Sequence, residues 1–138
     1  MAKVLKTLIL WLIGGATYIC IELAWRGHSH WTMFLVGGLM FVLVGSLNEY
    51  FTWEMSLLLQ GTLGAALITL AELICGYIIN IKLGWHVWDY SGVPMNLAGQ
   101  ICLPFSALWI LVAMLAVILD DWARYWLFQE EKPRYRLF

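Results

Sequence analysis

Four long apolar stretches dominate the sequence and limit what it can fold into. They cover residues 7–25, 31–51, 55–81 and 97–119. Each is long enough to cross a hydrocarbon core of about 30 Å as an α-helix, which takes roughly 17–25 residues. Only 12% of the chain is charged, against about 25% in soluble domains. We therefore predict an integral membrane protein that forms one all-α domain over residues 1–138.

The predicted architecture is a polytopic bundle of four transmembrane helices followed by an amphipathic helix at the membrane surface. The stretches are apolar on every face, which favours helices in lipid over the alternating strands of about 10 residues in β-barrels. The surface helix is predicted over residues 120–138, where aromatic residues recur at helical spacing beside Arg124. Glycine pairs at 14–15 and 37–38 are expected to let the helices pack closely.

Basic residues are unevenly distributed between the two sides of this bundle. Six fall on the side that carries both termini and the turn at 52–54, and two, Arg26 and Lys82, fall on the other side. Because positively charged segments stay in the cytoplasm, we expect a multi-pass protein of the cell membrane with both termini cytoplasmic. The net charge of −1 provides no basic surface for nucleic acid, and no nucleic-acid partner is expected.

Two acidic residues, Glu22 and Glu72, lie inside otherwise apolar stretches and in the outer half of their predicted helices. An ionised side chain near the bilayer centre costs about 2.5–3.5 kcal/mol, so each needs a partner, a proton or a water-filled pocket. Arg26 follows Glu22 by four residues, a spacing that favours an ion pair on a helix. Glu72 has no such neighbour, so either its partner comes from another helix or it is protonated.

The fourth stretch adds polar groups at the same depth. Pro104 has no N–H, so we expect it to kink this helix and to free the backbone carbonyl of Gln100. Gln100 would then offer a side-chain amide and a carbonyl near the two acids. The preceding loop, from Trp85 to Pro94, is rich in aromatic residues and is predicted to fold back over the bundle as a lid or a re-entrant segment.

All three histidines, His28, His30 and His86, fall on the outer side. With Asp89 and the intramembrane acids they form a candidate site for a divalent metal, since imidazole and carboxylate groups are suitable ligands. The His-x-His spacing is not a recognised zinc motif, and hydrogen bonding at the membrane interface is the alternative role. No other cofactor is indicated.

Three segments, taken in order, resemble a single family. They are Tyr18-x3-Glu22-x3-Arg26-Gly27-x-Ser29-His30-Trp31-Thr32-Met33, then Gly37-Gly38 with Asn48-Glu49, and then Trp88-Asp89-Tyr90-Ser91-x2-Pro94-x-Asn96-x2-Gly99-Gln100-Ile101. The chain is similar over nearly its full length to the putative ABC-transporter type IV family of CmpB-like small integral membrane proteins. The resemblance implies the membrane part of a transporter, because the chain has no Walker motif. It implies no particular site residues.

Three functional hypotheses follow. The first is a transport-type protein that binds a small polar ligand or ion in an outward polar pocket between the first, third and fourth helices. The residues of this pocket are Glu22, Arg26, His30, Glu72, Asp89 and Gln100. The second is an accessory or structural membrane protein whose polar cluster only holds the helices together.

The third hypothesis is a metal-dependent enzyme that acts on lipid, with His28, His30 and His86 as metal ligands and Glu22 as base. The transport-type protein is ranked first and the enzyme last. The expected partners are the lipid bilayer, a second copy of the chain, and a membrane or ATPase subunit.

Overall fold

Helices account for most of the structure, a computed structural model that describes residues 2–51 and 55–138. The elements in chain order are α1 (Lys3–Arg26), α2 (Trp31–Gly45), α3 (Leu47–Tyr50), α4 (Leu57–Gly76), the π-helix η1 (Tyr77–Lys82), β1 (Asn96–Leu97), β2 (Ile101–Cys102) and α5 (Leu103–Phe128). The all-α prediction is confirmed, with a two-stranded hairpin added. The turn predicted at 52–54 lies outside the described residues.

Three of the four predicted spans are long and apolar enough to cross a membrane. They are α1, α4 continued by η1, and α5, with 24, 26 and 26 residues. The helix predicted over 31–51 is broken at Ser46, whose hydroxyl donates to the carbonyl of Val42 at 2.6 Å, an interaction that often bends helices. The 15 residues of α2 reach only about 22 Å at 1.5 Å per residue. The chain is therefore a polytopic helical membrane protein with three long candidate spans in its described residues.

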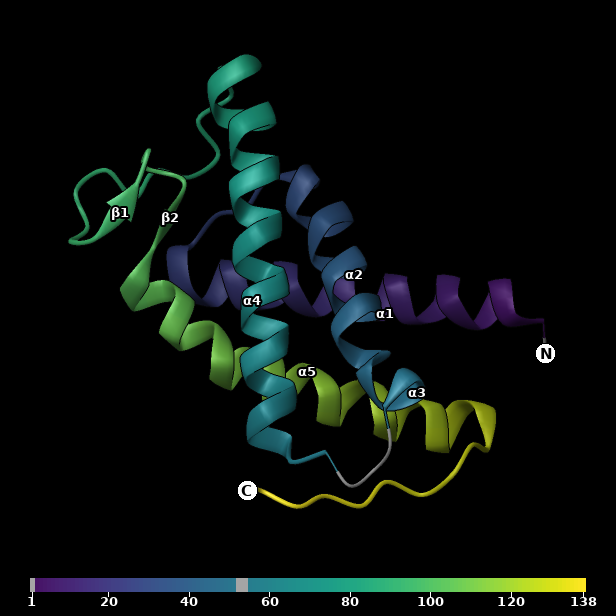
Figure 1. Cartoon of the computed structure of the whole chain (residues 1–138). Coiled ribbons are helices and arrows are strands. Elements are labelled where there is room, and N and C mark those ends of the chain that lie inside the picture. Colours follow the sequence, from purple (N-terminus) through teal and green to yellow (C-terminus); the bar gives the residue numbers. More distant parts are fainter. Residues whose placement is uncertain (1, 52–54) are drawn as a thin grey trace.

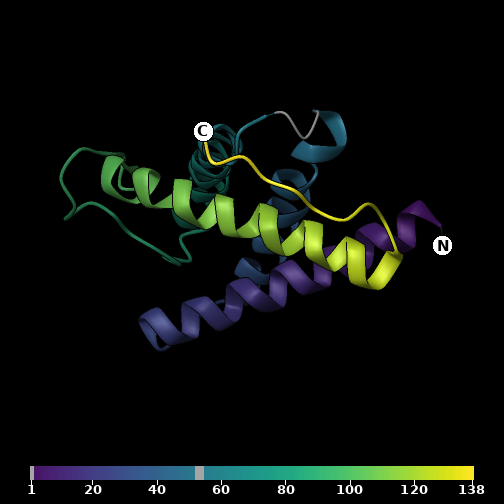
Figure 2. The ribbon, with the colours of Figure 1, turned by 90° about the horizontal axis from the view of Figure 1, so that it is seen from below.

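The helices cross one another steeply. In Figure 1, α2 and α4 run in one direction while α1 and α5 run across them. In Figure 2, α1 and α5 are seen along their length and α4 is seen end-on. α1 packs mainly on α2, and α4 packs mainly on α5. The arrangement thus differs from the near-parallel packing of an up-and-down bundle.

Small residues allow this close packing, as predicted. A Cβ atom added at Gly38 of α2 would lie 2.5 Å from the carbonyl oxygen of Trp11 of α1. A Cβ added at Gly64 of α4 would lie 2.7 Å from the Cβ of Ala113 of α5. Real side-chain carbons do not approach this closely, so the backbones meet only because these positions lack side chains.

The helix predicted over 97–119 begins later and ends later than its apolar stretch. α5 starts at Leu103 and continues to Phe128, while the residues before it pair as the antiparallel strands β1 and β2. Pro104 therefore lies in the first turn of α5, where its missing N–H has no helical partner to lose. The predicted kink is wrong for this reason.

The amphipathic surface helix predicted over 120–138 is also wrong. Its first residues complete α5, and residues 129–138 run back beneath the helices as an irregular tail, drawn in yellow in Figure 1. Gln129 ends the helix with a left-handed backbone, at φ 56°. Pro133, which is buried in the tail, could not donate a helical hydrogen bond.

The tail also completes the start of α4. The backbone N–H groups of Leu57 and Leu58 donate to the carbonyl oxygens of Arg136 and Leu137 at 2.6 and 3.1 Å. The first amide groups of a helix have no acceptor within the helix. The tail therefore supplies acceptors for two of them.

Candidate functional site

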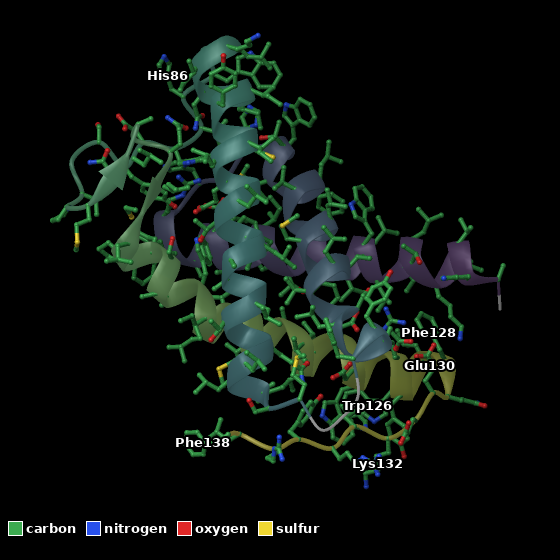
Figure 3. All side chains as sticks on the ribbon, in the orientation of Figure 1. His86, Trp126, Phe128, Glu130, Lys132 and Phe138 are labelled. Carbon is green, nitrogen blue, oxygen red and sulfur yellow. The ribbon has the colours of Figure 1, made fainter. Side chains whose placement is uncertain are left out.

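Polar side chains, several of them buried, gather at two ends of the molecule. The loop-end cluster lies where the loop of residues 83–95 meets α1, α4, η1 and α5, and it consists of Glu22, Arg26, Glu72, Asn80, Tyr90, Gln100 and Trp109. The tail-end cluster lies where the tail meets α1, α3 and α5, and it consists of Lys6, Glu49, Asp120, Asp121, Arg124, Glu130 and Tyr135. Figure 3 shows His86 near the first end and Glu130 and Lys132 at the other.

Glu22 and Arg26 form the ion pair that their spacing predicted. Arg26 Nε lies 2.6 Å from Glu22 Oε2, and the Glu22 residue is only 7% exposed. Arg26 also donates through Nη1 to the carbonyl oxygen of Val87 in the loop, at 3.3 Å. The pair therefore closes the end of α1 and holds the loop against it.

Glu72 is held by neutral donors. The Tyr90 hydroxyl donates to Oε1 at 2.9 Å and the Trp109 indole donates to Oε2 at 3.0 Å. Trp109 belongs to α5, so a neutral hydrogen-bond donor reaches Glu72 from another helix. Among residues 2–51 and 55–138, no Lys, Arg or His lies within ion-pair distance of Glu72. Its carboxyl is thus hydrogen-bonded but has no cationic partner there.

The two intramembrane acids are near enough for their charges to act on each other. The charges of Glu22 and Glu72 interact, and the Tyr18 ring of α1 lies near both. Arg26 is the one cation bonded to either carboxylate in the described part of the chain. Of these two acids, Glu22 therefore has a cationic partner and Glu72 has none in the described residues, which favours the approach of a further cation to Glu72.

Gln100 is buried at the centre of the loop-end contacts. Its Oε1 accepts a bond from Asn80 Nδ2 at 2.8 Å, and its Nε2 donates to the carbonyl of Ala98 at 3.0 Å. The backbone carbonyl that was expected to be free accepts a bond from the Trp88 indole at 3.0 Å. The amide packs directly on Gly76, where a side chain would collide with it.

Asn80 is a member of this cluster that sequence reasoning missed. It lies in η1, where the wider π-helical turn follows α4, and such turns are frequent at functional sites. Its Oδ1 accepts the backbone N–H of Val87 at 2.7 Å, while its Nδ2 reaches Gln100. An amide near the end of an apolar stretch could have indicated this role. Tyr90 lies in the predicted lid and in the third motif, but nothing in the sequence linked Tyr90 or Trp109 to Glu72.

Asp89 and His30 serve local structure rather than the cluster. Asp89 is exposed, and its carboxylate accepts the backbone N–H of Ser91 at 2.8 Å, which lowers the pKa of that carboxyl. His30 Nδ1 accepts the backbone N–H of Thr32 at 3.3 Å and caps the start of α2. Its ring also lies 5.7 Å from that of Trp85.

The predicted metal ligands are not brought together. Within the two described ranges, no group of three His, Cys, Asp or Glu side chains is arranged to hold a metal ion. His28 and His86 are exposed, and His30 turns its Nδ1 toward its own helix.

The tail-end cluster contains more charge and more ion pairs than the loop end. Asp120 is completely buried, and its Oδ2 lies 2.7 Å from Arg124 Nε. Arg124 Nη1 also lies 3.7 Å from both Glu49 and Glu130, and Lys6 lies 2.9 Å from Glu130. Sequence reasoning missed Asp120 because it assigned this residue to a surface helix.

The tail contributes a tyrosine to this cluster. The Tyr135 hydroxyl donates to Asp121 Oδ2 at 3.0 Å, and its ring packs beside the core formed by Val44, Leu47 and Val117. Burial and the neighbouring Asp121 charge raise the pKa of the Tyr135 phenol. The phenol therefore stays protonated and acts as a donor.

A separate groove of about 520 Å³ runs between α4 and α5. Its lining is mostly apolar and includes several small residues. The hydroxyls of Thr69 and Ser106, one from each helix, hydrogen bond to each other at 2.9 Å within it. The groove is thus distinct in chemistry from both charged clusters.

Long apolar helices joined through buried polar clusters define a multi-pass helical membrane protein. The family described as putative ABC-transporter type IV matches residues 4–133. The chain belongs to this family, in agreement with the resemblance of its three motifs. Comparisons with curated proteins and with solved structures gave no match.

Proposed function

We propose that the chain is the membrane part of a transport-type system and that it binds a small cation at the loop-end cluster, with Glu72 as the binding residue. The observation that carries the proposal is the set of partners of Glu72, a phenol and an indole, with no cation among the described residues. Intramembrane acids mark ligand or ion sites by default. An acid without a resident cation is suited to an exchangeable one.

The loop of residues 83–95 acts as the lid of this site. Tyr90 donates to Glu72 from the loop, so its departure would free one carboxylate oxygen for a ligand. The Glu22–Arg26 pair and Gln100 form the walls, because both hold the loop or its neighbours in place. Asp89 stabilises the turn of the lid by accepting the backbone N–H of Ser91.

The orientation proposed places both termini in the cytoplasm and the loop end outside. The six-to-two distribution of basic residues supports it. A second copy of the chain or a membrane or ATPase subunit would complete the transporter. The short reach of α2 and the absence of a Walker motif from the sequence both support such a partner.

The proposal is tested by thermal unfolding of the purified protein with Na⁺, K⁺, methylammonium or choline at constant ionic strength. A ligand present at 100 times its Kd stabilises a protein by about 2.7 kcal/mol. We expect at least one cation to raise the Tm of the wild type and of the control Glu131→Gln, which neutralises an exposed acid. Glu72→Gln should abolish the rise. An unchanged wild-type Tm, or an equal rise in Glu72→Gln, would contradict the proposal.

A second candidate is a structural or accessory membrane protein. The observation that favours it is the extensive hydrogen bonding of the cluster, in which both Glu72 oxygens and the amides of Asn80 and Gln100 have partners. Under this alternative, Glu72→Gln lowers the Tm by the same amount with and without each cation.

A further inference from the structure

The groove between α4 and α5 reaches the neighbourhood of Glu72. Its lining includes Thr69 and Leu73 on α4 and Ser106 and Ile110 on α5. Glu72 follows Thr69 by three residues, nearly one helical turn, and Trp109 follows Ser106 by the same interval. The bonded pair Glu72–Trp109 therefore lies next to the bonded hydroxyl pair in the groove.

The groove itself has the properties of a site for an alkyl chain. Its volume of about 520 Å³ falls within the range of about 300–1,000 Å³ typical of small-molecule sites. Apart from the hydroxyls of Thr62, Thr69 and Ser106, the lining side chains are aliphatic. A membrane-dissolved chain could occupy it from the bilayer without exposing apolar surface to water.

Charge selects the head group of such a ligand. Glu72 has no cation among the described residues, and Glu22 adds a second nearby negative charge. A negative head group would be repelled, whereas an ammonium group would complement the carboxylate. The hydroxyls of Thr69 and Ser106 can both donate and accept, so they can turn toward an incoming ammonium. The ring of Trp109 offers a face suited to a cation.

We infer that the groove and Glu72 together bind a single-chain amphiphile with an ammonium head group, its chain in the groove and its head at the Glu72 carboxylate. This inference rests on the proposed function, because it assigns a ligand class to the same carboxylate. It adds a route of entry, from the bilayer between α4 and α5. It also assigns part of the binding affinity to the alkyl chain of the ligand.

The inference is tested with three radiolabelled probes, dodecylammonium, methylammonium and dodecanoate, and the purified protein in maltoside micelles at neutral pH. We expect dodecylammonium to bind at least tenfold more tightly than methylammonium and to lose saturable binding in Glu72→Gln. Dodecanoate should neither bind saturably nor displace dodecylammonium. Equal affinity for the two ammonium probes would overturn the inference but leave the proposed function standing, whereas no saturable binding of either would overturn both.

A pair of matched variants tests the groove directly. Ala66→Phe places a ring in the groove from its exposed face on α4, and Ala16→Phe places the same ring on an exposed face of α1. We expect the affinity ratio of dodecylammonium to methylammonium to fall from at least ten to near one in Ala66→Phe and to stay at its wild-type value in Ala16→Phe. A ratio that is equal in the two variants, or displacement of the bound probe by dodecanoate, would overturn the inference.

Discussion

The two polar ends of this molecule hold Asp120 and Glu72 in opposite ways. At the tail end, the fully buried Asp120 is paired with Arg124, and Glu130 is paired with Lys6. At the loop end, Glu72 is held by a phenol and an indole. At the tail end Asp120, Glu49 and Glu130 thus each have a cation within ion-pair distance, while the loop end keeps one acid without a cation in the described structure. We infer that the first end fixes the fold and that the second is available for a ligand.

The two ends also differ in what holds them together. The tail-end contacts join α1, α3, α5 and the tail. Many of the loop-end contacts depend on one segment, residues 83–95, whose side chains are largely exposed. Segments with few buried contacts open at lower free-energy cost than the core. The loop end should therefore open first when the protein is destabilised.

Removing the cation of the tail end should have the largest effect. Arg124→Met leaves Asp120 buried without its ionic partner, a change that costs about 3–5 kcal/mol of unfolding free energy. Denaturant titration in micelles measures it. Combining Arg124→Met with Asp120→Leu should recover most of the loss, since apolar replacement of both partners is close to neutral. Arg26 is more exposed than Arg124, so Arg26→Met should cost less. A smaller loss for Arg124→Met than for Arg26→Met would refute the comparison.

Removing the tail hydroxyl should have an intermediate effect. Tyr135→Phe deletes the donor to Asp121 and should cost about 1 kcal/mol. The pKa of Tyr135 is raised in the folded state. Its contribution to the free energy of unfolding is therefore complete below the unfolded-state pKa near 10 and is lost as the pH rises through the folded-state pKa. Titrations at pH 7 and pH 11 should therefore show a smaller difference between wild type and Tyr135→Phe at pH 11. A difference that is independent of pH argues against this role of the phenol.

The smallest effect is expected in the lid. The bond from Ser91 N–H lowers the pKa of Asp89 below its ordinary value of 3.8. Because the pKa of Asp89 is lowered in the folded state, its carboxylate stabilises the turn at pH values above the unfolded-state pKa. This stabilisation is lost as the pH falls through the folded-state pKa. The Ser91 amide resonance should titrate with a midpoint below pH 3.8 and should not titrate in Asp89→Asn. A midpoint at or above 3.8 would show that the turn is not held by this carboxylate.

Local features of the sequence predicted local features of the structure. The long apolar stretches became α1, α4 and α5 because lipid requires each segment to satisfy its own backbone. The i, i+4 spacing of Glu22 and Arg26 was enough to predict their ion pair. The glycine pairs of α1 and α2 predicted close helix packing because no other residue allows it.

The remaining features depend on residues far apart in the chain. The prediction for Pro104 failed because proline is compatible with a helix start as well as with a kink, and the apolar hairpin before it resembles a helix in composition. Asp120 was expected at the surface because the apolar stretch stops before it, although its side chain packs against Gly45 of α2 and is completely buried. The donors to Glu72 come from a loop and from another helix, and no spacing rule relates them.

The hydrogen bonds between the tail and α4 set an order for folding. The first amide groups of α4 find their acceptors at residues 136 and 137, which leave the ribosome only after α4 and α5 have been synthesised. The first turn of α4 therefore relies on water or lipid head groups until residues 136 and 137 have been synthesised. Docking of the tail closes a loop over most of the chain, and such closures form late. Insertion and final locking are thus separate events in the biogenesis of this protein, and the second can be followed by the protection of the Leu57 amide from hydrogen exchange.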